Sequence, residues 1–140
     1  MITIDGSQVL SFSLQLRDVP KEARKELRRN IIDATDVIVQ TARSNASWSR
    51  RIPKAISSRV LFGSQTSGVQ IVVDSEKAPH ARPYEGIGQR TLMFRHPVFG
   101  GDDWVEEPTR PFLRPALRQH EDDVVRGIQA AINSAFETLG

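Results

Sequence analysis

The chain has 140 residues, the size of one typical domain with one hydrophobic core, so we expect one site or one surface. Apolar residues make up 39% of the sequence and charged residues 26%, which argues against both a disordered chain and a membrane-spanning one. Cysteine is absent, which excludes disulfides, cysteine-ligated zinc and thiol catalysis.

The sequence lacks the common membrane and export signals. No run approaches the roughly 18 to 20 consecutive apolar residues that a membrane span requires. The N-terminal stretch MITIDGSQ also lacks the basic region and apolar core of a signal peptide. We therefore expect a soluble protein that is made in a cytoplasm and has no membrane partner.

The net charge of +2 conceals two parts of opposite sign. Residues 17–59 hold 11 Lys/Arg against 5 Asp/Glu, a net +6, whereas residues 60–140 hold 8 against 11, a net −3. This split permits one surface of a copy to attract the opposite surface of its neighbour, and it equally permits the basic part to face nucleic acid. Both sets of charges can also be solvated helix faces, so charge alone leaves all these interpretations open.

The first third of the chain predicts a strand and a long helix. Residues 9–16 alternate between apolar and polar side chains, which is typical of a half-buried strand. Pro20 then supplies a helix start, and apolar residues recur at three- and four-residue steps through about residue 45. This spacing predicts an amphipathic helix of roughly 25 residues. The following stretch SNASWSRRIPK reads as a loop.

The remaining chain predicts further strands and a second long helix. The runs ISSRVLFG and GVQIVVD flank the polar connector SQTS, which indicates a hairpin. Residues 75–90 leave room for a short helical turn around Tyr84. TLMFRHPVF predicts another strand, in which Pro97 requires an edge position or a bulge, with the segment after Trp104 pairing back. After Pro111, apolar residues trace one helical face to the C-terminus.

This order predicts an α+β fold: a mostly antiparallel sheet of three to five strands packed against two long helices, one near the N-terminus and one at the C-terminus. We expect a single domain over residues 1–140, with residues 77–110 as a protruding loop and strand segment. The second face of the sheet is then uncovered within the monomer. An uncovered sheet is a liability unless a partner covers it.

The sequence contains no recognisable catalytic constellation, which would need a nucleophile beside a base or a converging pair of titratable groups. His80, His96 and His120 lie in different segments, and HEDD at residues 120–123 points its polar groups in different directions. GIG at residues 86–88 lacks the context of a dinucleotide-binding fingerprint, and no GKS or GKT occurs. We therefore expect no enzyme, no metal and no cofactor.

Two other kinds of site stay open. Trp48 lies in SWSRRIPK, where its indole can stack on a base while Arg50, Arg51 and Lys54 contact phosphates. A basic loop of this kind is also typical of a protein interaction surface or of a solvated loop. The acidic pairs DD and EE that flank Trp104 can in principle hold a hard cation, but they are more typical of solvated charges.

The segment from residue 79 to residue 117 has the most specific pattern. Its stretches PHARPYEGIG, FRHPVFG and DDWVEEPTRPFLRPALRQH resemble the neck and tail-completion proteins of long-tailed bacteriophages and prophages. In that family a Tyr-x-x-(small or apolar)-Gly segment precedes a loop and strand. A Pro-Phe-(Leu/Ile)-x-Pro-Ala-(Leu/Ile/Phe) motif opens the last helix. FRHPVFG with a following Trp is similar to the variant carried by phages of actinobacteria.

The residues that match the family motifs fall into two groups. The first comprises Tyr84, Glu85, Gly86 and Gly88, and the second comprises Pro111, Phe112, Leu113, Pro115, Ala116 and Leu117. GIG departs from the Glu-x-Gly-Thr of many relatives. In the second motif, proline suits an extended lead-in and a first helical turn, where backbone donors are unpaired in any case. We expect Phe112 and Leu113 to staple this helix start onto the sheet.

The resemblance implies a structural subunit that either completes the tail or joins it to the head connector. It implies a ring of identical copies, six in number, with DNA passing through the lumen, inside the virion after assembly in the host cytoplasm. The implied partners are further copies and the neighbouring neck, head-completion and tail-tube proteins. We expect the interaction surface to include Trp48, Arg50, Arg51, Lys54, His96 and Trp104. The alternative is a small nucleic-acid-binding protein that uses the basic loop.

Overall fold

The computed structural model describes residues 2–4, 9–13, 16, 19–63, 67–85, 93–97 and 104–139. For residues 2–4, 9–13, 82–83, 93–97, 104–107 and 138–139 it describes the backbone only. The helices are α1 (Lys21–Asn45), α2 (Ile52–Ala55), α3 (Ala81–Glu85) and α4 (Leu113–Leu139). The strands are β1 (Ile2–Ile4), β2 (Val9–Ser13), β3 (Ile56–Phe62), β4 (Ser67–Val73), β5 (Met93–Pro97) and β6 (Trp104–Pro108).

The strands form a four-stranded antiparallel sheet in the order β1-β2-β4-β3 and a separate two-stranded ribbon of β5 and β6. In the predicted hairpin, Val60 of β3 lies opposite Val69 of β4. On the other side of β4, Leu10 of β2 lies opposite Ile71. The combination of two long helices with antiparallel strands confirms the α+β class.

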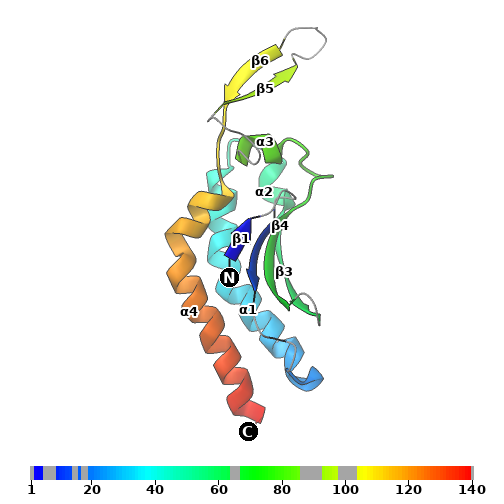
Figure 1. Cartoon of the computed structure of the whole chain (residues 1–140), viewed down its shortest axis with the longest axis vertical. Coiled ribbons are helices and arrows are strands. Elements are labelled where there is room, and N and C mark those ends of the chain that lie inside the picture. The colour runs from blue at the N-terminus through cyan, green and yellow to red at the C-terminus, as the bar shows by residue number, and fades with distance from the viewer. Residues whose placement is uncertain are drawn as a thin grey trace.

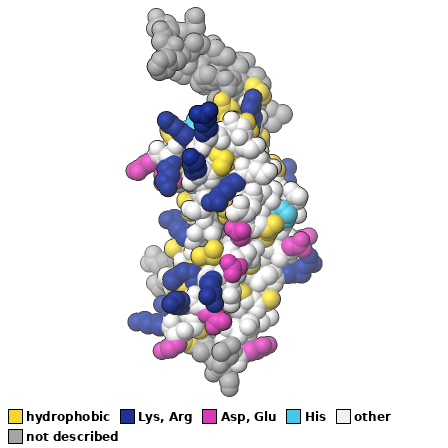
Figure 2. All heavy atoms as spheres, turned by 180° about the vertical axis from the view of Figure 1, so that it is seen from behind, with side chains coloured by type: hydrophobic (Ala, Val, Ile, Leu, Met, Phe, Trp, Pro, Cys, Tyr) yellow, Lys and Arg dark blue, Asp and Glu magenta, His cyan; other side chains and the backbone are white. Residues whose placement is uncertain are grey.

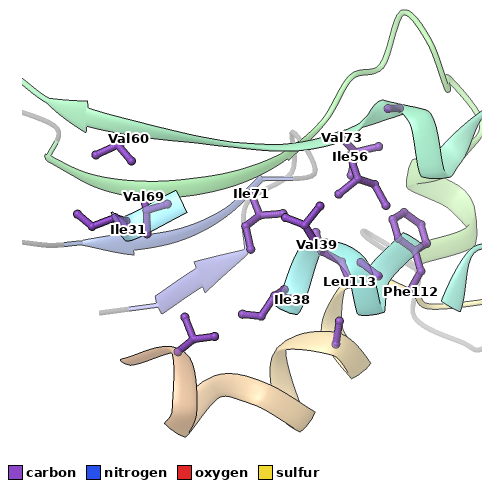
Figure 3. Close-up of a cluster of buried hydrophobic side chains, with 14 of the residues drawn as sticks. Ile31, Ile38, Val39, Ile56, Val60, Val69, Ile71, Val73, Phe112 and Leu113 are labelled. Atoms are coloured by element: carbon purple, nitrogen blue, oxygen red, sulfur yellow. The ribbon is translucent and has the colours of Figure 1, made fainter. Parts of the chain in front are cut away.

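Helix α1 begins directly after Pro20 and ends at Asn45, close to the predicted limits. Its apolar stripe is buried because the residues recur on one helical face. The buried residues of α1 are Leu27, Ile31, Thr35, Ile38, Val39 and Ala42. This stripe lies across one face of the sheet, where Ile31 and Val39 face the side chains of β4 (Figure 3).

Helix α4 has α1 as its principal partner, so it differs from the prediction that both long helices lie directly on the sheet. The two helices run side by side along the molecule (Figure 1). They approach closely at Gly127, where an added Cβ atom would lie 3.2 Å from the Cβ atom of Ala34. The apolar stripe of α4 indicated that one face is buried, but it did not indicate which element buries it.

Two further local differences from the prediction have simple causes. Residues 52–55, which were expected in a loop, form the short helix α2, because Pro53 suits the first turn of a helix. The first predicted strand is described over Val9–Ser13, Leu16 at its expected end is not in a strand, and residues 14–15 lie outside the described residues; a short strand, β1, pairs with Val9–Ser13. None of the described helices combines the length and the apolar character needed to cross a membrane.

The β5–β6 ribbon projects from the end of the body that carries α2 and α3, whereas α1 begins and α4 ends at the opposite end (Figure 1). Pro97 lies opposite Trp104 in this ribbon. Because the ribbon has two strands, each of them is an edge, which is the position that Pro97 was predicted to require.

Candidate functional site

The two motif segments meet at the end of the body from which the ribbon projects. Glu85, the last residue of α3, is 1% exposed. Its carboxylate accepts hydrogen bonds from the backbone N–H groups of Phe112 at 2.7 Å, Leu113 at 3.0 Å and Arg114 at 2.8 Å. The first N–H groups of a helix have no partner within it, and the positive end of the helix dipole favours an anion. Glu85 therefore caps α4.

The second motif builds the start of α4. Phe112, Leu113 and Ala116 are fully buried; Phe112 lies near Ile56 of β3 and Leu113 near Val39 of α1 (Figure 3). The Phe112 carbonyl also accepts a hydrogen bond at 3.1 Å from the Asn45 side chain, at the end of α1. The motif thus joins the start of α4 to both the sheet and α1.

Three other motif residues lie around this buried centre. Pro111 and Pro115 are exposed, and Leu117 is half-buried against the core. Pro115 occupies the first turn of α4, where its missing N–H removes no intrahelical bond. Gly86 and Gly88 of the first motif lie outside the described residues.

The base of the ribbon is closed by a second contact. The backbone N–H of Arg110 donates to the Tyr84 carbonyl at 2.7 Å. The chain therefore leaves the body after Tyr84 and returns to it at Arg110, so the ribbon starts and ends at one place. Together with the Glu85 cap, this bond fixes both ends of the excursion to the same small region of the body.

Trp48 packs against that region from the end of α1. Its ring meets the ring of Tyr84 edge to face, with the centroids 4.6 Å apart. The Arg110 guanidinium lies 4.9 Å from the centroid of the Trp48 ring, within the range of a cation–π contact. Trp48 is still 38% exposed. The structure thus brings Trp48 of the predicted interaction surface together with Tyr84 of the first motif.

The basic loop beside Trp48 presents three cations to solvent, because Arg50, Arg51 and Lys54 are all exposed. Figure 2 shows Lys and Arg side chains gathered towards this end of the body, with a second group towards the opposite end. Arginine and lysine in such a group attract an anionic surface of either nucleic acid or protein. The loop therefore presents an exposed positive charge to solvent.

A serine and a histidine also meet in this loop, with Ser49 Oγ 3.2 Å from His80 Nε2. Ser49 Oγ in addition accepts the N–H groups of Arg51 and Ile52, at 3.3 and 3.2 Å. Burial, and then the neighbouring Arg51 guanidinium, lower the pKa of His80. Within the described chain no carboxylate bonds to His80, so the pair lacks the third group of a hydrolase triad. Ser49 serves instead as a cap for α2.

The other histidines lie elsewhere. His120 contacts Thr41 Oγ1 at 2.9 Å and thereby links α4 to α1. His96 and Trp104, both expected in the interaction surface, belong to the ribbon, where His96 lies opposite Val105.

No cluster of His, Cys, Asp or Glu suited to a metal ion is found among the described side chains. The DD pair at residues 102–103 lies outside the described residues, and the EE pair at 106–107 is described only as backbone.

The Glu85 cap was not predicted from the sequence. The only signal for it was the position of Glu85 next to Tyr84 in the first motif.

Comparisons with known proteins identify no relative: no protein-family model matches the chain, and no curated protein or solved structure is significantly similar to it.

Proposed function

We propose that this chain is a structural subunit of the head-to-tail joint of a long-tailed bacteriophage, and that it acts in a ring of identical copies. The observation that supports this proposal is the Glu85 cap on α4. Three residues of the second motif, Phe112, Leu113 and Ala116, are buried around this cap. These residues hold together the end of α3 and the start of α4, between which the ribbon projects, and this role is structural.

The described polar groups with catalytic potential support the same view. Ser49 caps α2, His120 links two helices, and Glu85 caps α4. Each of these side chains therefore has a partner within the fold. In a subunit that works through shape and surface charge, polar side chains can all serve to hold the fold together. In an acyl-transfer or acid–base enzyme, the catalytic side chains must instead converge on a substrate.

In the proposed ring, six copies meet through head-to-tail contacts, which close when the rotation between neighbours allows it. The ring lies between the head connector and the tail tube, in contact with neighbouring neck, head-completion and tail-tube proteins. DNA passes through its lumen, and the basic loop of Arg50, Arg51 and Lys54 is available for non-specific contact with phosphates. The protein then resides in the virion and is assembled in the host cytoplasm.

Deletion of the gene from the phage that carries it tests this function. We expect lysates that contain DNA-filled heads and separate tails in electron micrographs, and joined particles after supply of the wild-type protein. The protein should also be found in purified virions by mass spectrometry. Infectious, fully joined particles from the deletion mutant would rule out the proposed role.

The basic loop supports a second candidate function, direct binding of nucleic acid. Three exposed cations lie beside Trp48, which is 38% exposed. Its ring is already in contact with Tyr84 and Arg110, which leaves less of it for a base to stack on.

Replacing Arg50, Arg51 and Lys54 by Ala tests this alternative by titration with duplex and single-stranded DNA. If the loop binds DNA, the variant should lose affinity and show a flatter salt dependence. Replacing Lys21, Lys25 and Arg29 by Ala removes the same charge at the other end of α1 and serves as the control. Equal binding by wild type and by the loop variant would exclude this function.

A further inference from the structure

The β5–β6 ribbon lacks a covering layer in the described part of the chain. Its strands pair with each other, and neither strand has a helix or another strand as a substantial partner. A single two-stranded hairpin is marginally stable in water. The sequence nevertheless places Met93, Phe94, Trp104 and Val105 in these strands, and large apolar residues of this kind are usually buried. The ribbon therefore needs a surface that the described part of its own body does not supply.

The charge of the ribbon indicates which surface suits it. Strands β5 and β6 carry Arg95 against Glu106 and Glu107, a net charge of −1, and the sequence between the strands adds Asp102 and Asp103. A matching surface must be basic and must have an apolar part.

The first turns of α1 offer both properties at the opposite end of the molecule. Residues 21–30 hold 5 Lys/Arg against 2 Glu, a net charge of +3, and Lys25, Arg28 and Arg29 are exposed. A hollow between α1 and α4 lies beside them. Its apolar lining comes from Ala23, Leu27 and Ala135, and its polar lining from Glu22, Glu26, Asn30 and Ser134. An adjoining hollow is lined by Glu22, Lys25, Glu26 and Arg29.

The basic loop is a poorer match for the ribbon. Its cations follow Trp48 in the sequence, and the ring of Trp48 is already in contact with Tyr84 and Arg110. The loop also lies at the same end of the body as the ribbon (Figure 1). The start of α1, by contrast, combines exposed cations with a hollow that is apolar in part, at the far end of the molecule.

We propose that the β5–β6 ribbon of one copy docks onto the first turns of α1 in a second copy, over the hollow between α1 and α4. The occupant of this surface is thus another copy of the same chain. Because ribbon and surface lie at opposite ends, the contact is head-to-tail, and it closes into a ring or continues as a filament according to the rotation between copies. This inference specifies the contact between copies within the proposed function and rests on that function.

A charge swap in the purified full-length protein tests the contact. At low salt, we expect sedimentation velocity to show that the wild type self-associates as its concentration rises. At about 0.5 M salt the self-association should be weaker, because salt screens exposed charges. One variant carries Glu106→Lys and Glu107→Lys in the ribbon, and the other carries Lys25→Glu and Arg29→Glu in α1. Each variant alone should lose at least about tenfold in association constant.

An equal mixture of the two variants should recover the association. In the mixture, the basic ribbon of the first variant faces the acidic α1 of the second, and the acidic ribbon of the second faces the basic α1 of the first. The variant with Arg59→Glu and Arg118→Glu, at exposed positions of β3 and α4, has the same change of charge as the α1 variant. It should associate as wild type does, which separates the α1 surface from a general effect of net charge.

Three outcomes would overturn the inference: a wild type that stays monomeric at about 1 mM, variants that associate like wild type, or a mixture that associates no better than its components. Circular dichroism of each variant verifies that it is folded. These results are independent of the gene-deletion experiment. A failed charge swap together with separated heads and tails in the deletion mutant would reject this contact and retain the proposed function.

Discussion

The buried carboxylate of Glu85 lies 2.7 Å from the backbone nitrogen of Phe112, 27 residues further along the chain. This contact joins the end of α3 to the start of α4, and the ribbon occupies the sequence between them. A helix start and a projecting segment are therefore fixed by the same side chain. Substitutions at the cap test directly whether the motif residues contribute to the stability of the fold.

Glu85→Gln should lower the free energy of unfolding by about 2 to 3 kcal/mol, because the amide loses the charge that favours the helix start and offers one acceptor oxygen where the carboxylate offered two. Urea denaturation followed by circular dichroism measures the change. Glu76→Gln, at an exposed position, is the matched control and should change the stability by no more than about 0.5 kcal/mol. A Glu85→Gln protein as stable as wild type would show that the cap contributes little.

Phe112→Ala should destabilise the protein by about 3 to 5 kcal/mol, because Phe112 is fully buried and the truncation leaves a cavity in the core. The control is Phe136→Ala, since Phe136 lies on the same helix and is 44% exposed. Thermal or urea unfolding of both variants measures the difference. Similar losses in the two variants would contradict the burial of Phe112.

Gly127→Leu should separate α1 from α4 and cost about 1 to 3 kcal/mol, because even a Cβ atom at this position would lie 3.2 Å from the Cβ atom of Ala34. Ala130→Leu introduces the same leucine side chain at an exposed position of α4 and is the control. Chemical denaturation compares the two. If Gly127→Leu were as stable as the control, the close approach of the helices would be refuted.

His80 predicts a particular pH dependence of stability. Burial, and then Arg51, lower the pKa of His80 from its ordinary value of 6.5, so the folded state favours the neutral imidazole. As the pH falls below 6.5, the unfolded chain takes up the proton first, and the free energy of unfolding decreases. The decrease ends once the pH is also below the folded-state pKa. Above both values His80 contributes no pH dependence.

Urea denaturation at about pH 7.5 and about pH 5.5 tests this expectation. His80→Gln should lose less stability than wild type between the two conditions, because the titrating group is gone. His120→Gln, which alters a histidine in contact with Thr41, is measured alongside as the matched substitution of another histidine. An identical loss in wild type and in His80→Gln would exclude His80 as the source.

The sequence predicted the elements better than their partners. The spacing of Leu27, Ile31 and Ile38 indicated α1, and the runs around SQTS indicated the β3–β4 hairpin, because these signals are local. The packing of α4 along α1 was missed because a helical stripe does not specify what covers it. The small size of Gly127 marks the close approach, but an isolated glycine in a helical pattern can equally mark a helix end.

Only part of the candidate site was predicted, because sequence patterns reveal local clusters but not contacts between distant segments. Trp48 and the basic loop stood out as a local cluster in the sequence. The contacts of Trp48 with Tyr84 and Arg110 join three distant segments, so no spacing pattern could reveal them. Glu85 was also hidden, since a glutamate in a polar stretch is usually exposed and its burial depends on the start of a helix 27 residues away.

The hydrogen bond between the Tyr84 carbonyl and the Arg110 amide, 2.7 Å long, makes the structure of the body independent of the length of the ribbon. Its two ends meet at one place, so the body is closed beneath it whatever its length. Lengthening such an excursion adds only the slowly growing entropy of a longer loop, about 0.6 kcal/mol for each doubling. Changes in the length of the ribbon can therefore accumulate independently of the core.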